Sequence, residues 1–152
     1  RYELPKRGRS LNWDSKVSVK ILHPAQGEDY ANINNASIVI QLKYLNSSFL
    51  FMGDLESEYE EELIKQFGSS LKVDVLKVGH HGSRTSSSQE FLIKTKPKKC
   101  IVQVGDGNKF GHPTPSTLKR LQSLCKDVYR TDESGDITLE TDGSKIKIKT
   151  QH

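Results

Sequence analysis

Short apolar runs alternate with amphipathic segments along most of the chain, and this alternation constrains the fold more than any other feature. Residues 16–22 alternate apolar and polar side chains, which is the pattern of a half-buried strand. Residues 73–78 form a mostly apolar run that ends directly in a glycine, which indicates a buried strand. Strands that alternate with helices predict a layered α/β architecture.

The remaining elements are predicted from the same two periodicities. Further strands are expected at residues 37–44, 48–52, 100–104, 128–130, 136–140 and 145–149. Helices are expected at residues 56–67, 89–95 and 115–126. Thr114 and Pro115 strengthen the last of these, because Thr is a good N-cap and Pro suits the first helical position. Residues 1–15 are basic and polar and predict a loop or an edge strand.

Composition sets broad limits on what the chain does. Its 152 residues suit one domain or a large part of one. The net charge of +4 permits an anionic substrate such as nucleic acid but does not argue for one. Cys100 and Cys125 lack the spacing of a metal site, and we expect two buried structural thiols. No run approaches the roughly 18 apolar residues that are needed to cross a bilayer.

Three polar clusters each follow an apolar run. They are Gly-Asp at 53–54, Gly-His-His-Gly-Ser at 79–83 and Gly-His-Pro at 111–113. Open α/β sheets usually place ligands where strands end and loops begin. Asp and His are suitable ligands for a hydrolytic metal centre, and the neighbouring glycines allow the backbone to approach a ligand closely. The clusters therefore predict a metal site.

Each cluster also has a structural interpretation. Asp54 could simply open the helix that follows it, and His112 could be a turn residue. His23, at the end of a strand, is better explained as a structural residue. The pair His80 and His81 is harder to explain in this way, because an exposed loop has no packing reason to hold two imidazoles.

Taken in order, the motifs resemble the C-terminal part of the metallo-β-lactamase-like domain of ComEC-type competence proteins. Each motif alone is weak, but five in the right order are specific. The resemblance covers roughly residues 17–139. The segments that carry it are residues 34–37, 53–56, 74–83, 111–113, and 129–132 with 135–137.

The resemblance implies an α/β fold that is half of an αββα sandwich, with a mixed sheet and helices on its outer face. It assigns residues 1–152 to the C-terminal part of a single metallo-β-lactamase-like domain. It implies that Asp54 bridges two divalent metal ions, zinc or manganese, and that His80 or His81 supplies a further ligand. His80 is favoured as the second catalytic residue beside Asp54, because it comes first after the strand. The candidates for binding substrate or orienting ligands are Asn35, Ser83, Arg84 and His112.

The chain departs from this family in one large respect. The hallmark His-x-His-x-Asp-His motif, which supplies most of the ligands, does not occur in it. The simplest explanation is that the N-terminal half of the domain is missing. We then expect the intact domain to be a metal-dependent hydrolase of phosphodiester or nuclease type, and this chain alone to be inactive. The alternative is a degenerate, non-catalytic half-domain that serves as a binding or assembly module.

The resemblance also implies partners and a location. The expected partners are nucleic acid or another phosphoester substrate, the missing N-terminal half, and the membrane-channel part of a parent protein. A half-domain should expose apolar surface, so self-association is expected as well. A ComEC-type parent would place the chain at the extracytoplasmic face of a bacterial membrane, whereas a soluble relative would leave the location open.

Overall fold

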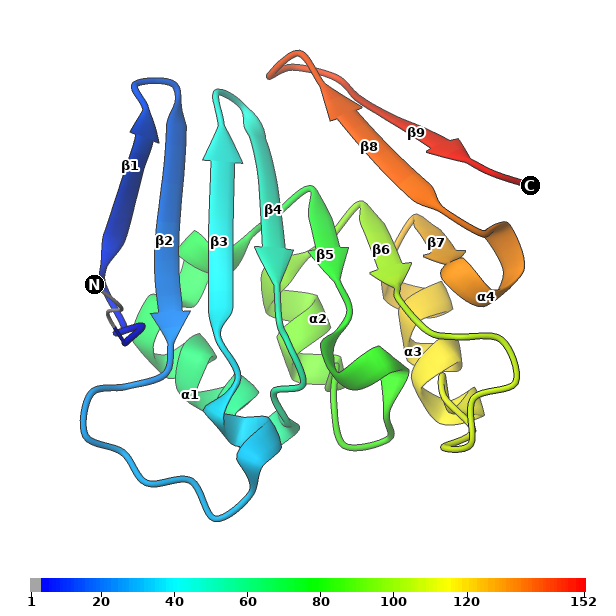
Figure 1. Ribbon diagram of the computed structural model, residues 1–152, viewed down its shortest axis with the longest axis horizontal. Coiled ribbons are helices and arrows are strands. Elements are labelled where there is room, and N and C mark those ends of the chain that lie inside the picture. Colours follow the sequence, from blue (N-terminus) through cyan, green and yellow to red (C-terminus); the bar gives the residue numbers. More distant parts are fainter. Residues whose placement is uncertain (1–3) are drawn as a thin grey trace.

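The computed structural model describes residues 4–152 and is built on a seven-stranded mixed sheet (Figure 1). The strands lie in the sheet in their order along the chain. They are β1 (Ser10–Asp14), β2 (Val17–His23), β3 (Val39–Tyr44), β4 (Ser47–Phe51), β5 (Val75–Lys77), β6 (Lys99–Val102) and β7 (Asp127–Arg130). Strands β1 to β4 pair antiparallel, and strands β4 to β7 pair parallel. Because β4, β5 and β6 run in one direction, their carboxyl ends lie at the same edge of the sheet.

Helices cover one face of this sheet (Figure 1). The α-helices are α1 (Ser57–Phe67), α2 (Gln89–Thr95), α3 (Pro115–Leu124) and the short α4 (Thr131–Ser134). Three 3-10 turns interrupt the loops, at Ile33–Ala36, Gly68–Leu71 and Gly79–Gly82. This arrangement confirms the predicted α/β class and the mixed sheet with helices on one face. No helix within residues 4–152 is long and apolar enough to cross a membrane.

The core lies between the sheet and its helices. Leu50, Leu76 and Val102 come from neighbouring strands and are fully buried in one apolar cluster. The same cluster includes Leu63 of α1 and Leu121 of α3. The alternation of side chains along each strand places the intervening residues on the opposite face of the sheet.

That opposite face is apolar and only partly covered. The antiparallel pair β8 (Ile137–Thr141) and β9 (Ile146–Thr150) forms a second, two-stranded sheet beside it. A hollow of about 300 Å³ lies on this face and is lined by Phe49, Phe51 and Leu139, among others. Phe51 remains 41% exposed. We call this surface the open face.

Most predicted elements are present with small shifts in their ends. The run at 73–78 forms a strand only over Val75–Lys77, because Asp74 is used for tertiary contacts. Its carboxylate accepts hydrogen bonds from the backbone N and the hydroxyl of Ser48 and pairs with Lys98. The basic N-terminal segment contains an edge strand, β1, which is one of the two predicted possibilities.

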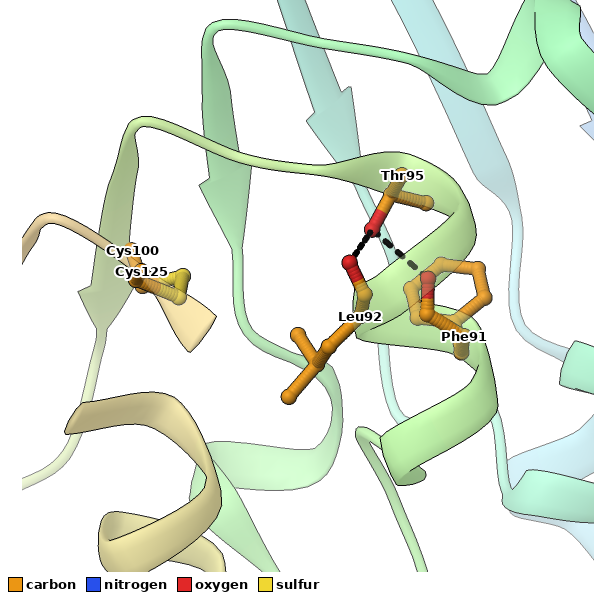
Figure 2. The surroundings of a disulfide bond; sticks show 5 residues. All are labelled: Phe91, Leu92, Thr95, Cys100 and Cys125. Atoms are coloured by element: carbon orange, nitrogen blue, oxygen red, sulfur yellow. Dashed lines mark hydrogen bonds between the residues drawn. A yellow bond between two sulfur atoms is a disulfide. The ribbon is translucent and has the colours of Figure 1, made fainter. Parts of the chain in front are cut away.

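The two cysteines are not free thiols, so that prediction was wrong. Cys100 on β6 and Cys125 just after α3 form a disulfide (Figure 2). Their Cα atoms lie 6.1 Å apart, within the range that a disulfide spans. Both residues are buried, as predicted, but the pairing of β7 with β6 brings the end of α3 back to β6 and joins them across 25 residues of sequence. The Thr95 hydroxyl, which donates to the backbone oxygen of Phe91, lies in the same region of the core (Figure 2).

Candidate functional site

The three predicted polar clusters meet at the carboxyl ends of β4, β5 and β6. The amide nitrogen of His80 donates to the carbonyl of Gly53 at 2.9 Å, which joins the first two clusters. The amide nitrogen of Thr114 donates to the carbonyl of Gly82 at 3.0 Å, which joins the second and third. A Cβ atom added to Gly82 would lie 2.6 Å from the Cβ of Pro113, so this close approach requires glycine.

The backbone of the histidine pair is in an unusual conformation. His80 and His81 have φ angles of 45° and 53°, which lie in the left-handed region that non-glycine residues seldom adopt. Two consecutive residues of this kind carry a conformational cost of about 1–3 kcal/mol each. The surrounding hydrogen bonds hold this turn in place, and the result is that both imidazoles reach the same edge of the sheet.

Asp54 and His81 face each other across a short gap. The Nε2 atom of His81 lies 3.5 Å from the Oδ1 atom of Asp54. The other ring nitrogen, Nδ1, lies 2.6 Å from the carbonyl oxygen of Gln103, so it must carry a proton and donate. In the neutral imidazole, Nε2 then presents a lone pair toward the Asp54 carboxylate. Two acceptors that face each other in this way can be bridged by a proton, by a water molecule that donates to both, or by a metal ion.

His80 is placed differently. Its Nδ1 atom is buried and makes no hydrogen bond to any described residue, and it lies 3.6 Å from the Oε1 atom of Glu56. The Glu56 carboxylate also accepts a hydrogen bond of 3.1 Å from the hydroxyl of Thr85. Carboxylates beside the rear nitrogen of an imidazole commonly orient the ring toward a ligand at its other nitrogen. Glu56 is therefore a candidate positioning residue that the sequence analysis missed.

His112 completes the group of imidazoles. Its ring centroid lies 5.6 Å from that of His80, and its Nδ1 atom is buried without a partner among the described residues. Burial, followed by the nearby charges of His80 and His81, lowers the pKa of His112 below 6.5. The neutral form of His112 is thus favoured at the rim of the site, where it could accept a proton or a hydrogen bond.

Lys77 is a second residue that the sequence analysis did not single out. It is the last residue of β5 and contributes to the lining of the hollow on the open face. Burial lowers the pKa of the Lys77 amine, and the nearby negative charge of Asp54 opposes this shift.

The other predicted residues differ in what they contact. Asn35 is 2% exposed, and its side chain donates to Glu58 at 2.7 Å and accepts from the amide nitrogen of Glu56 at 3.0 Å. Ser83 is buried, and its hydroxyl lies 3.1 Å from that of Thr85. Asn35 and Ser83 thus fix the loops around the site, whereas Arg84 is exposed beside it. Their predicted roles in substrate binding stay predictions.

A complete ligand set for one metal ion is not found within residues 4–152. No group of three or more His, Cys, Asp or Glu side chains there is arranged to hold an ion. Asp54 and His81 have the donor chemistry and spacing for two ligands of one ion, whereas a catalytic zinc site usually takes three protein ligands. The geometry pairs His81, rather than the favoured His80, with Asp54.

Comparison with known proteins identifies homologues among competence proteins. No family model matches the chain. It is 40% identical over 117 residues to ComE operon protein 3 of Bacillus subtilis, an alignment that covers 77% of this chain and 15% of that protein. It is 34% identical over 123 residues to Competence protein ComA of Neisseria gonorrhoeae, which covers 81% of this chain and 18% of that protein.

Recombination protein 2 of Haemophilus influenzae is 32% identical over 142 residues, 93% of this chain and 17% of that protein. The chain thus spans less than a fifth of the length of each of these relatives. The similarity covers most of the chain, including the clusters at the ends of β4, β5 and β6. The chain is therefore homologous to one segment of competence proteins that include ComE operon protein 3.

Proposed function

We propose that this chain is the C-terminal part of a metallo-β-lactamase-type domain that hydrolyses phosphodiester bonds in DNA during uptake. The observation that carries the proposal is the pair of acceptors formed by Asp54 and His81, which face each other at 3.5 Å at the carboxyl ends of the parallel strands. This is the expected place for a ligand in an α/β sheet, and the donor atoms suit zinc or manganese. The names of the relatives, which refer to competence and recombination, support DNA as the substrate.

The residues of this chain have distinct roles in the proposed site. Asp54 and His81 would hold a divalent ion, and Gln103 fixes the tautomer of His81. His80, oriented by Glu56, would supply a further ligand atom. Bound divalent ions would supply a water of lowered pKa and positive charge opposite the developing oxyanion. His112, held neutral at the rim, accepts a hydrogen bond or proton from the substrate side.

The open face is the proposed contact surface for the missing N-terminal half. Its hollow is lined mainly by apolar side chains, including Leu42, Phe49 and Ile101. A large apolar sheet face is normally covered by another layer of the same domain. The missing half would both bury this face and bring further ligands to the edge where Asp54 lies. Without it, the exposed apolar surface favours self-association.

The proposed location is the extracytoplasmic face of a bacterial membrane, beside the membrane-channel part of a longer protein. The disulfide between Cys100 and Cys125 supports this location, because such bonds persist in oxidising compartments. The name of one relative, which refers to competence, supports a role in DNA uptake.

A nuclease assay tests the proposal. We would measure zinc- and manganese-dependent hydrolysis of DNA by this chain and by a longer protein that adds a preceding segment with His-x-His-x-Asp-His. We expect no activity from this chain alone, because it supplies too few ligands, and metal-dependent activity from the longer protein. Asp54→Ala should abolish that activity, whereas Asp29→Ala, at an exposed acidic residue after β2, should leave it unchanged.

Two outcomes would contradict the proposal. Strong, chelator-resistant activity from this chain alone would show that hydrolysis needs neither a metal ion nor a second half of the domain. A folded longer protein that binds DNA but does not hydrolyse it with either metal would instead favour the alternative, a non-catalytic binding or assembly module.

A further inference from the structure

The loop between β6 and α3 holds an exposed aromatic ring beside the candidate site. Phe110 is 81% exposed. Its ring stacks on that of His112, with a centroid distance of 5.9 Å and an interplanar angle of 27°. The His112 ring in turn lies 5.6 Å from that of His80. The ring of Phe110 is thus in contact with the outermost of the imidazoles at the site, that of His112.

The conformation of this loop is fixed by hydrogen bonds rather than by burial of Phe110. The Asn108 side chain donates to the carbonyl of His112 at 2.6 Å and accepts from the amide nitrogen of His112 at 2.9 Å. Gly111 has a φ angle of 65°, which allows the chain to turn between the two rings. On its far side the loop is anchored by Pro113, which packs on Gly82. The fold therefore presents Phe110 at a defined place.

An exposed Phe is not by itself informative, because single apolar residues are common on protein surfaces. What distinguishes Phe110 is its position and orientation. One face of its ring contacts His112, and most of its surface is open to solvent. A flat group that enters beside the imidazoles can therefore stack on it. The exposed Lys109 next to it adds a positive charge of the kind that contacts phosphates.

We propose that Phe110 is a stacking platform for a nucleobase of the DNA strand whose backbone is bound at the Asp54–His81 edge. This inference rests on the proposed function and specifies its substrate. An internal base of a duplex is already stacked on both faces, so a base within a strand can stack on a protein ring only when it is unpaired. The site should therefore prefer single-stranded DNA or frayed ends over paired duplex.

A fluorescence measurement tests the stacking directly. The chain has a single tryptophan, Trp13, which is 69% exposed and lies on β1. In the double variant Trp13→Phe/Phe110→Trp, the only indole would stand at the platform. We expect single-stranded oligothymidylate at low salt to quench its fluorescence. An abasic strand of equal length and charge should quench it on the order of 10-fold less effectively. Equal quenching by the two strands, or no quenching by either, would overturn the inference.

A conservative variant separates stacking from simple packing. Phe110→Leu keeps an apolar side chain but removes the aromatic face. In binding measurements with a labelled strand, it should weaken binding of oligothymidylate on the order of 10-fold and leave binding of the abasic strand unchanged. If Phe110 instead packs against another part of the protein, Phe110→Leu would affect the two strands equally, and this result would also overturn the inference.

The inference and the proposed function can fail separately. In the longer protein, Phe110→Leu should raise KM for single-stranded DNA and change kcat little, because the platform binds substrate without touching the reacting atoms. If the longer protein and its Phe110→Leu variant both show metal-dependent hydrolysis with the same KM, the stacking role of Phe110 is wrong and the proposed hydrolase activity stands. If the tryptophan variant shows base-dependent quenching but the longer protein does not hydrolyse DNA, the proposed hydrolase activity is wrong. Phe110 would then be a stacking residue of a DNA-binding module.

Discussion

At the scale of single residues, a buried carboxylate holds the loop that follows the histidine pair. Glu60 of α1 is fully buried and accepts hydrogen bonds from the amide nitrogens of Ser87 and Ser88, at 2.6 and 2.8 Å. Burial raises the pKa of Glu60, and these hydrogen bonds and the charge of Arg120 oppose the shift. Arg120 of α3 donates to the carbonyls of the same loop. Two helices thus clamp the segment behind the site.

Removing this carboxylate should be costly. Glu60→Ala leaves the buried amide of Ser87 and the half-buried amide of Ser88 without their acceptor, which we expect to lower the free energy of unfolding by about 2–4 kcal/mol. Glu61→Ala is the matched control on the same helix. Its side chain is 61% exposed and lies 3.8 Å from Lys65, so its loss should cost less than about 1 kcal/mol. Urea unfolding measures both, and equal effects would contradict the assigned role of Glu60.

His23 makes stability depend on pH. Burial lowers the pKa of His23 below 6.5, and its Nε2 atom donates to the carbonyl of Asn35 at 2.7 Å. Below pH 6.5 the unfolded chain binds a proton at His23 that the folded chain does not, so the free energy of unfolding rises with pH in that range. The slope approaches about 1 kcal/mol per pH unit and ends as the pH falls below the folded pKa.

The variant His23→Gln isolates this effect. Gln can still donate to the Asn35 carbonyl but does not titrate, so the variant should lose the slope that His23 contributes between pH 5 and pH 7. Thermal unfolding of the two proteins across that range checks the prediction. Parallel pH profiles would show that another group is responsible.

The sequence predicted some residues of the site and not others, for a physical reason. The sequence itself shows which residues lie next to a glycine after a predicted strand. These are Asp54, His80, His81 and His112. Glu56 looks like one of several acidic residues at a helix start, and only the fold brings it to His80. Contacts made through space leave no local signal.

At the scale of elements, the parallel strands β4, β5 and β6 create the site, and a disulfide ties β6 to the helix that follows it. The sequence placed each cluster after a predicted strand, and the parallel pairing of β4, β5 and β6 in the structure brings these strand ends to one edge. The disulfide could not be predicted in this way. Two cysteines 25 residues apart carry no pairing signal until α3 returns to the sheet.

The disulfide should contribute substantially to stability. Closing a loop of this length in the unfolded chain predicts a contribution of about 3 kcal/mol. The double variant Cys100→Ala/Cys125→Ala should lose about this amount in urea unfolding, and a reductant should destabilise the original protein but not the variant. Unchanged stability after complete reduction, with both thiols shown to be free, would contradict the prediction.

At the scale of the whole molecule, the sheet is covered on one face and open on the other (Figure 1). The open face and the incomplete ligand set both fit the proposal that a second half of the domain supplies the covering layer and the remaining ligands. The α/β class was predictable from the alternation of strands and helices, whereas the helices on one face were implied by the resemblance to the metallo-β-lactamase-like domain.

The central claim is that Asp54 and His81 together hold a divalent ion, and NMR of the histidine side-chain nitrogens under zinc titration tests it most directly. We predict that the Nε2 resonance of His81 shifts as zinc is added and that Asp54→Ala removes this shift. The buried His23 and the terminal His152 are internal references within the same spectra. An unchanged His81 resonance, or an equal shift in the Asp54→Ala variant, would contradict the account.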